Sequence, residues 1–236
     1  MHEHNIKLSI IIPIHNEERT VKEILNKLQT LHDFAKIEII LVNDGSTDKT
    51  KSILIENTNL YDQLIDLPNN NGKGKAVIEG IKKAKNDYII IQDADLEYDP
   101  NDIIYFLKKI DSDESDLIMG SRFIGKHRSV LNFWHMVGNK FITFIFNLIN
   151  NTTFTDIYCC YCLFKKDNLD ANKLKSFGWG QQAEILTYLV YSSKKIHEIG
   201  INYNARTYNE GKKIRYYDVF SVIYWIVITR IKRAIR

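Results

Sequence analysis

Cysteine, proline and long apolar runs are scarce in this chain of 236 residues. It has three prolines, and its three cysteines, Cys159, Cys160 and Cys162, are too crowded for a disulfide framework and lack the partner pair of a zinc site. We expect buried thiols in a reducing compartment. With 44% hydrophobic and 26% charged residues, the composition excludes a disordered or fibrous chain.

No apolar stretch is long enough to cross a membrane. The longest uncharged ones, 141–149 and 219–229, fall well short of the roughly 20 residues that a bilayer requires. The polar N-terminal residues 1–7 leave no room for a signal peptide, which predicts a cytosolic protein.

The charge is nearly balanced, and a net charge of +3 gives no indication of nucleic-acid binding. The C-terminal segment 216–236 differs, because apolar residues there are interspersed with basic ones and no acid follows Asp218. This predicts a basic amphipathic helix lying on an anionic membrane surface. The apolar residues of this segment are explained almost as well by a buried C-terminal helix or by an oligomer contact. The basic residues are Arg230, Lys232, Arg233 and Arg236.

Short apolar runs alternate with amphipathic stretches of helical period in the first half of the chain. They predict strands at 7–14, 37–42, 64–67, 87–92 and 116–120. Such alternation is typical of an α/β fold with a mostly parallel central sheet flanked by helices. A helix is expected over 18–31, with Asn16 as its N-cap. A second helical pattern, 130–149, is rich in aromatics that we expect mostly in the core: Phe133, Trp134, Phe141, Phe144 and Phe146.

Polar residues follow several of these strands, and in open sheets ligands bind at the carboxyl ends of strands. Asp93 and Asp95 can turn their oxygens toward one Mg²⁺ or Mn²⁺, although such a triplet alone is more often a turn of solvated acids. The carboxylates of Glu17 and Asp44 are placed to accept hydrogen bonds from a ribose or base. The glycine-rich turn at 71–76 is no Walker A loop, and the first strand lacks the dinucleotide-binding Gly-x-Gly-x-x-Gly turn.

Together these segments resemble family 2 glycosyltransferases, and most of all the branch of polyprenyl-phosphate (dolichyl-phosphate) sugar synthases. The resemblance covers almost the whole chain, and rests on Pro13-x-His15-Asn16-Glu17-Glu18, Val42-Asn43-Asp44-Gly45-Ser46-x-Asp48, Asn71-Gly72-Lys73-Gly74-x-Ala76, Asp93-x-Asp95, Gly120-Ser121-Arg122-Phe123 and Tyr203-x-x-Arg206-x-Tyr208-x-Glu210-Gly211-Lys212. His15 stands where a tyrosine is usual, and would still stack on a base.

The resemblance implies a nucleotide-diphosphate-sugar transferase (GT-A) fold and inverting, metal-dependent transfer of a hexose. The metal, Mg²⁺ or Mn²⁺, would be held by Asp93 and Asp95, with Glu97 as a third ligand. The donor sugar nucleotide would contact Pro13, His15, Glu17, Asp44, Lys73, Asp93, Ala94 and Asp95. Arg122, Arg206 and Lys212 would be catalytic cations beside Asp95. Mannose with guanosine and glucose with uridine both suit the branch.

The acceptor decides whether a general base is needed. A polyprenyl phosphate is already anionic, so the site would need only cations such as Arg122, Lys126 and Arg128 to position it. A sugar hydroxyl must lose a proton, and Asp156 or Glu184 would then be the base. For Asp156, a purely structural role as a buried hydrogen-bond acceptor is equally compatible with the sequence.

We therefore predict one glycosyltransferase domain over 1–210, with a nucleotide-sugar-binding half (1–122) and an acceptor half (123–210). Residues 211–236 would form a phosphate-clamping segment and the basic helix. The predicted enzyme transfers a hexose to a polyprenyl phosphate on the cytosolic face of a membrane. The alternatives are a family 2 transferase that uses a sugar hydroxyl, and a non-catalytic nucleotide-sugar-binding module.

Overall fold

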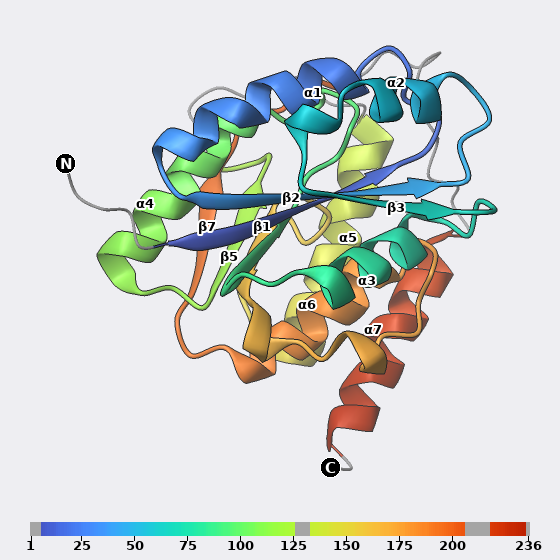
Figure 1. Ribbon diagram of the computed structural model, residues 1–236. Coiled ribbons are helices and arrows are strands. Elements are labelled where there is room, and N and C mark those ends of the chain that lie inside the picture. The colour runs from blue at the N-terminus through green and yellow to red at the C-terminus, as the bar shows by residue number, and fades with distance from the viewer. Residues whose placement is uncertain (1–5, 126–132, 206–217, 235–236) are drawn as a thin grey trace.

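A seven-stranded sheet forms the centre of the computed structural model, which describes residues 6–125, 133–205 and 218–234 (Figure 1). In spatial order its strands are β3 (Gln63–Leu67), β2 (Lys36–Asp44), β1 (Lys7–Ile14), β4 (Tyr88–Ile91), β6 (Cys162–Lys165), β5 (Leu117–Ser121) and β7 (Ile196–Gly200). Only β6 among these runs antiparallel to its neighbours. The other strands therefore all end at one edge of the sheet, where the amino end of β6 also lies.

Helices flank this sheet, with α1 and α2 on one side of β1–β3 and α3 on the other (Figure 1). In the described part of the chain, no helix is both long and apolar enough to cross a bilayer. The α-helices are α1 (Val21–Leu28), α2 (Thr50–Glu56), α3 (Lys73–Lys83), α4 (Ile103–Asp113), α5 (Phe133–Asn150), α6 (Gln181–Ser192) and α7 (Asp218–Ala234).

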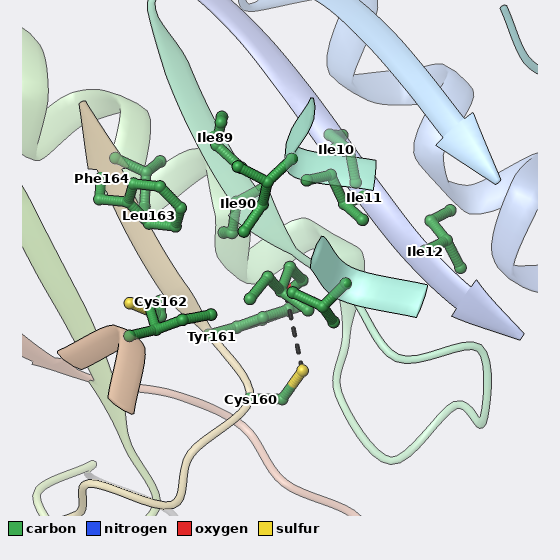
Figure 2. Packing of buried hydrophobic residues seen from close by; sticks show 14 of the residues in the cluster. Ile10, Ile11, Ile12, Ile89, Ile90, Cys160, Tyr161, Cys162, Leu163 and Phe164 are labelled. Atoms are coloured by element: carbon green, nitrogen blue, oxygen red, sulfur yellow. Dashed lines mark hydrogen bonds between the residues drawn. The ribbon is translucent and has the colours of Figure 1, made fainter. Parts of the chain in front are cut away.

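Isoleucine-rich strands build the core. β1 and β4 lie side by side with their isoleucines fully buried, as expected for parallel strands covered on both faces (Figure 2). β6 adds Leu163 and Phe164 from the other side. All three cysteines are buried, as predicted, and the Cys160 thiol donates to the carbonyl oxygen of Ile91 at 3.7 Å.

The five predicted strands are confirmed, but two further strands were not predicted. β6 is only four residues long, and β7 is half-buried along its whole length, so neither has a strong periodic signal. Asn16 is not an N-cap, because the helix begins at Val21 after Thr20. Asn16 instead adopts a φ of 56° in the preceding turn, where its side chain accepts the N–H of Thr47 at 2.8 Å.

The aromatics of α5 correct a second expectation. Of the five expected mostly in the core, only Phe146 is buried. The other four are exposed by half or more: Phe133, Trp134, Phe141 and Phe144.

Gly80, on α3, is a position where a methyl group does not fit. A Cβ there would lie 2.3 Å from Cγ2 of Ile11, which is fully buried. We therefore expect Gly80→Ala to lower the free energy of unfolding by about 1–3 kcal/mol, despite the higher helix propensity of alanine. The matched control is Gly138→Ala in α5, where a Cβ would meet nothing within 4 Å; it should stabilise by up to about 1 kcal/mol. Urea unfolding measures both variants, and shifts of the same sign would contradict this account.

Candidate functional site

Asp44, at the carboxyl end of β2, holds the loop that leads into α3. Its Oδ1 accepts the N–H of Asn71 at 2.9 Å and its Oδ2 that of Gly72 at 2.8 Å, and the residue is 3% exposed. Gly72 adopts a φ of 93°, a conformation that favours glycine, and α3 begins directly after it at Lys73. The carboxylate of Asp44 thus fixes the position of Lys73. Its predicted contact with a nucleoside stays a prediction.

His15 contacts the same loop through Asn70. Its Nδ1 donates to the carbonyl oxygen of Asp44 at 2.8 Å, and Nδ2 of Asn70 lies 2.9 Å from its Nε2. Glu17 lies in the turn after β1, where its carboxylate accepts the hydroxyl of Thr20 at 2.7 Å. Pro13 is half-buried near the end of β1 itself. The predicted donor-binding residues of β1 and β2 therefore gather at neighbouring strand ends.

Lys73 and Asp93 form an ion pair just beyond β4. Nζ of Lys73 lies 2.5 Å from Oδ1 of Asp93 and 3.7 Å from Sγ of Cys160. Desolvation lowers the pKa of Lys73, but the surrounding acidic groups, with Asp93 the foremost, together outweigh it and raise that pKa above its ordinary value. Ala94 is 3% exposed and anchors the backbone between the two aspartates.

The predicted metal ligands are only partly brought together. Oδ1 of Asp95 accepts the N–H of Glu97 at 3.1 Å, while the carboxylate of Glu97 accepts the hydroxyl of Tyr203 at 2.9 Å. Within the described residues, no three His, Cys, Asp or Glu side chains are grouped as metal ligands. The carboxylate oxygens of Asp93 and Asp95 nevertheless match the preference of hard divalent cations, and Asp93 already binds the cation of Lys73.

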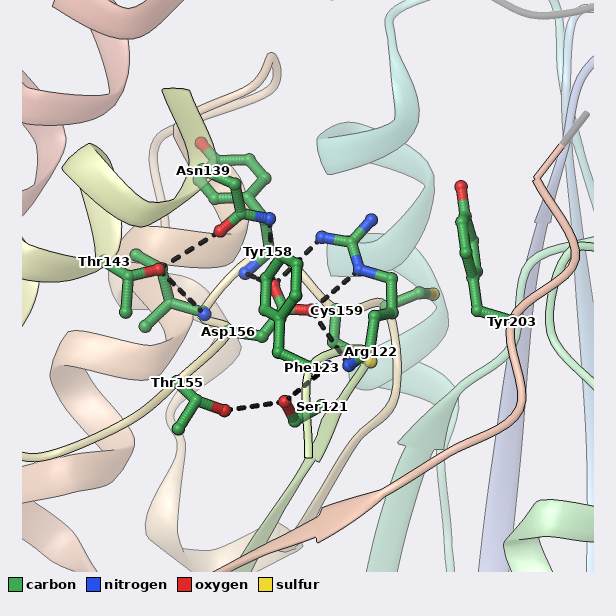
Figure 3. Close-up of polar contacts among 12 residues, drawn as sticks. Ser121, Arg122, Phe123, Asn139, Thr143, Thr155, Asp156, Tyr158, Cys159 and Tyr203 are labelled. Carbon is green, nitrogen blue, oxygen red and sulfur yellow. Dashed lines mark hydrogen bonds and ion pairs between the residues drawn. The ribbon is translucent and has the colours of Figure 1, made fainter. Parts of the chain in front are cut away.

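Arg122 follows β5 and forms a bidentate ion pair with Asp156 (Figure 3). Nε donates to Oδ2 at 2.7 Å and Nη2 to Oδ1 at 2.9 Å, and the guanidinium packs 5.2 Å from the ring centroid of Tyr203. Asp156 is fully buried and also accepts the backbone N–H of Arg122, the side-chain amide of Asn139 and the backbone N–H of Tyr158. These five hydrogen bonds occupy its lone pairs and fix the guanidinium.

Glu198, on β7, holds the turn that carries Asp156. Its carboxylate accepts the N–H of Thr155 at 2.9 and 3.0 Å and that of Asp156 at 3.1 Å. Burial raises the pKa of the Glu198 carboxyl. Our sequence analysis missed Glu198, since it lies in an unpredicted strand and belongs to no motif. It also missed Asn139, whose helix was predicted but whose partner lies outside that helix.

Glu184, in α6, accepts hydrogen bonds through its carboxylate from the neighbouring loop that contains Lys175 and Ser176. It is 2% exposed and accepts the backbone N–H groups of Lys175 at 2.9 Å and Ser176 at 2.8 Å. Burial raises the pKa of its carboxyl. The remaining predicted phosphate contacts lie outside the described residues: Lys126, Arg128, Arg206 and Lys212.

Comparison with known proteins gives a family match over most of the chain. The model of glycosyl transferase family 2 matches residues 9–172. An uncharacterized protein of Methanocaldococcus jannaschii is 32% identical over 222 residues, which cover 86% of this chain and 93% of that protein.

Two named relatives are longer. The dolichol-phosphate mannosyltransferase of Pyrococcus furiosus is 27% identical over 88% of this chain and 59% of its own length. The low-salt glycan biosynthesis hexosyltransferase Agl6 of Haloferax volcanii is 27% identical over 84% of this chain and 48% of its own length. The chain thus spans about half the length of these curated relatives.

Solved structures of glycosyltransferases share the fold. Glucosyl-3-phosphoglycerate synthase from Mycobacterium tuberculosis, in complex with Mn²⁺, UDP and phosphoglyceric acid, matches with a TM-score of 0.70 at 15% identity, over 97% of this chain and 78% of that one. TarS 1–349 of S. aureus, in complex with UDP-GlcNAc, matches with a TM-score of 0.65 at 18% identity, over 95% and 66%. The GT-A fold expected from the sequence is confirmed.

Asp44→Asn tests whether this carboxylate anchors the loop before α3. Asparagine keeps one acceptor oxygen but turns an NH₂ group toward one of the two backbone N–H groups. We therefore expect the free energy of unfolding to fall by about 1–3 kcal/mol. Asp33→Asn, at an exposed residue after α1, is the control and should change it by less than about 0.5 kcal/mol. Chemical denaturation compares the two, and equal stability would refute the anchoring role.

Proposed function

Because the chain belongs to glycosyl transferase family 2, we propose that it moves a hexose from a nucleotide diphosphate sugar to a polyprenyl phosphate. Transfer would invert the anomeric carbon and take place at the cytosolic face of a membrane. The similarity to a dolichol-phosphate mannosyltransferase supports a lipid phosphate acceptor and favours mannose. Glucose from a uridine nucleotide is the other donor compatible with the sequence.

The burial and hydrogen bonds of the two candidate bases, Asp156 and Glu184, are the observation that favours one acceptor class over the other. A sugar hydroxyl must pass its proton to a base, whereas a lipid phosphate is already anionic. Asp156 is fully buried and accepts five hydrogen bonds, and Glu184 is buried and holds two backbone N–H groups. Neither carboxylate is open to an incoming hydroxyl. This arrangement supports a phosphate nucleophile.

Arg122 is the described cation best placed to position that phosphate. A guanidinium has five N–H donors, and two of its nitrogens bond Asp156, so donors remain for a phosphate oxygen. The ion pair with Asp156 keeps the planar group in one orientation before the acceptor binds. Lys126 and Arg128 would add charge at the acceptor, and Arg206 and Lys212 would clamp the diphosphate.

The donor would lie across the ends of β1, β2 and β4, with its diphosphate at Asp93 and Asp95. A Mg²⁺ or Mn²⁺ ion held by these two carboxylates would stabilise the charge on the departing nucleoside diphosphate by several kcal/mol. Glu97 would join them only by exchanging its contact with Tyr203. The ammonium group of Lys73, which pairs with the Asp93 carboxylate, would leave that carboxylate and contact a donor phosphate when the donor binds.

A transfer assay distinguishes the two acceptor classes. Radiolabelled GDP-mannose or UDP-glucose is incubated with Mn²⁺ and a short-chain polyprenyl phosphate in detergent, and label is expected in the organic extract. Glu184→Gln should keep transfer within about tenfold of wild type, whereas loss of a general base costs about 10²–10⁴-fold. Asp111→Asn, at an exposed residue of α4, is the control. Label that enters only water-soluble products would refute the lipid acceptor.

Metal binding can be measured without turnover. Lys73→Met removes the cation that competes for Asp93, so it should bind Mn²⁺ more tightly in the absence of donor, by roughly fivefold for a pair worth about 1 kcal/mol. Asp95→Asn should bind it more weakly. Lys51→Met, which breaks the pair with Asp66, is the matched control. Electron paramagnetic resonance of free Mn²⁺ gives the affinities, and an unchanged affinity in Asp95→Asn would contradict the metal assignment.

A further inference from the structure

The helix α5 carries large apolar side chains on its exposed side as well as on its buried side. The buried residues are Ile142, Thr143, Phe146 and Asn150. At 3.6 residues per turn, the exposed side chains project within roughly a third of the helix circumference. They are Phe133 (61% exposed), Trp134 (75%), Val137 (39%), Phe141 (50%), Phe144 (62%) and Leu148 (70%).

The helix α7 packs against α5 and also exposes large apolar side chains. Val222, Ile226 and Thr229 are buried, and a second row of large apolar side chains faces outward. These are Phe220, Tyr224, Val227 and Ile231. Of the fourteen exposed large hydrophobic residues among those described, six lie on α5 and four on α7, so the exposure is concentrated there rather than scattered. We call these ten residues the α5–α7 face.

The charges on both helices have one dominant sign. α5 contains no acidic residue, and the only one in α7 is Asp218 in its first turn. The basic residues are Lys140 on α5 and Arg230, Lys232 and Arg233 on α7. The guanidinium groups of Arg230 and Arg233 lie over the ring of Tyr191 in α6, at 4.6 and 5.4 Å from its centroid. Aromatic side chains combined with Lys and Arg are typical of helices that lie in the headgroup region of anionic membranes. A partner protein would be expected to meet these bases with acids, whereas an anionic bilayer supplies both the apolar and the negative layer.

We propose that the α5–α7 face docks on an anionic lipid bilayer, with α5 contributing as much as the C-terminal helix α7. α5 also reaches the candidate site, because Asn139 donates to Asp156 at 3.0 Å and Asp156 holds Arg122. If the proposed function is right, this face would put Arg122 close to the membrane in which the acceptor lipid is anchored. The docking surface deepens that proposal and is tested separately from it.

Co-sedimentation of the full chain with vesicles tests the surface. The vesicles contain phosphatidylcholine alone or mixed with phosphatidylglycerol, and neither polyprenyl phosphate nor sugar nucleotide is present. Wild type should bind the anionic vesicles, and less so at high salt. Phe144→Ser/Leu148→Ser in α5 and Phe220→Ser/Tyr224→Ser in α7 should each lower the partition coefficient by about tenfold or more.

The matched control is Ile55→Ser/Tyr105→Ser, since both residues are exposed hydrophobics of 57% on other helices. It should leave vesicle binding unchanged, and near-UV circular dichroism checks the fold of every variant. The proposal would be overturned if the wild-type protein did not co-sediment with anionic vesicles. It would also be overturned if the α5 variant bound them as tightly as wild type. Concentration-dependent dimerisation abolished by the same substitutions without vesicle binding would overturn it too, and would assign the face to a second copy of the chain.

The transfer assay on the short-chain acceptor in detergent is run on the same variants. Vesicle binding without transfer to any acceptor would refute the proposed function and leave the docking surface standing. Transfer in detergent without vesicle binding would refute the docking surface alone.

Discussion

The arrangement of charges in the site depends on the antiparallel strand β6, which lies between β4 and β5. Because β6 runs in reverse, the segment before it reaches the edge where the parallel strands end. That segment brings Asp156 to Arg122 and Cys160 to Lys73. In an all-parallel sheet, the same residues would lie at the opposite edge, and Arg122 would have no buried carboxylate to hold it.

Each carboxylate at this edge is matched to specific donors. Asp44 holds two backbone N–H groups, Asp93 holds Lys73, and Asp156 holds Arg122. For the buried Asp44 and Asp156 the pairing follows from the cost of burial, because an unpaired buried charge costs several kcal/mol. For Arg122 the proposed consequence is preorganisation, because the pair with Asp156 orients the guanidinium before a ligand arrives.

How much the sequence predicts depends on the range of the interaction. The first five strands and the polar residues that end them follow from local periodicity, and both are found where expected. Glu198 and Asn139 were not predicted, since each acts on a turn that is distant in sequence. For Asp156, the sequence left the base and the buried acceptor equally open. Only the three-dimensional contacts reveal five donors around that carboxylate.

Hydrophobicity alone predicts that the aromatic residues of α5 lie mostly in the core, yet four of the five are exposed. A helix usually turns its apolar side inward, yet the inward side of α5 supplies Asn139 to Asp156 and Thr143 to the backbone N–H of Ile157. Those polar contacts lie on the same side as the buried Ile142 and Phe146, and the other four aromatics face outward. Exposed apolar surface forfeits roughly 25 cal/mol per Å² that burial would recover. In the proposed docking, a lipid surface would bury the α5–α7 face without disturbing the hydrogen bonds of Asn139 and Thr143 on the other side of α5.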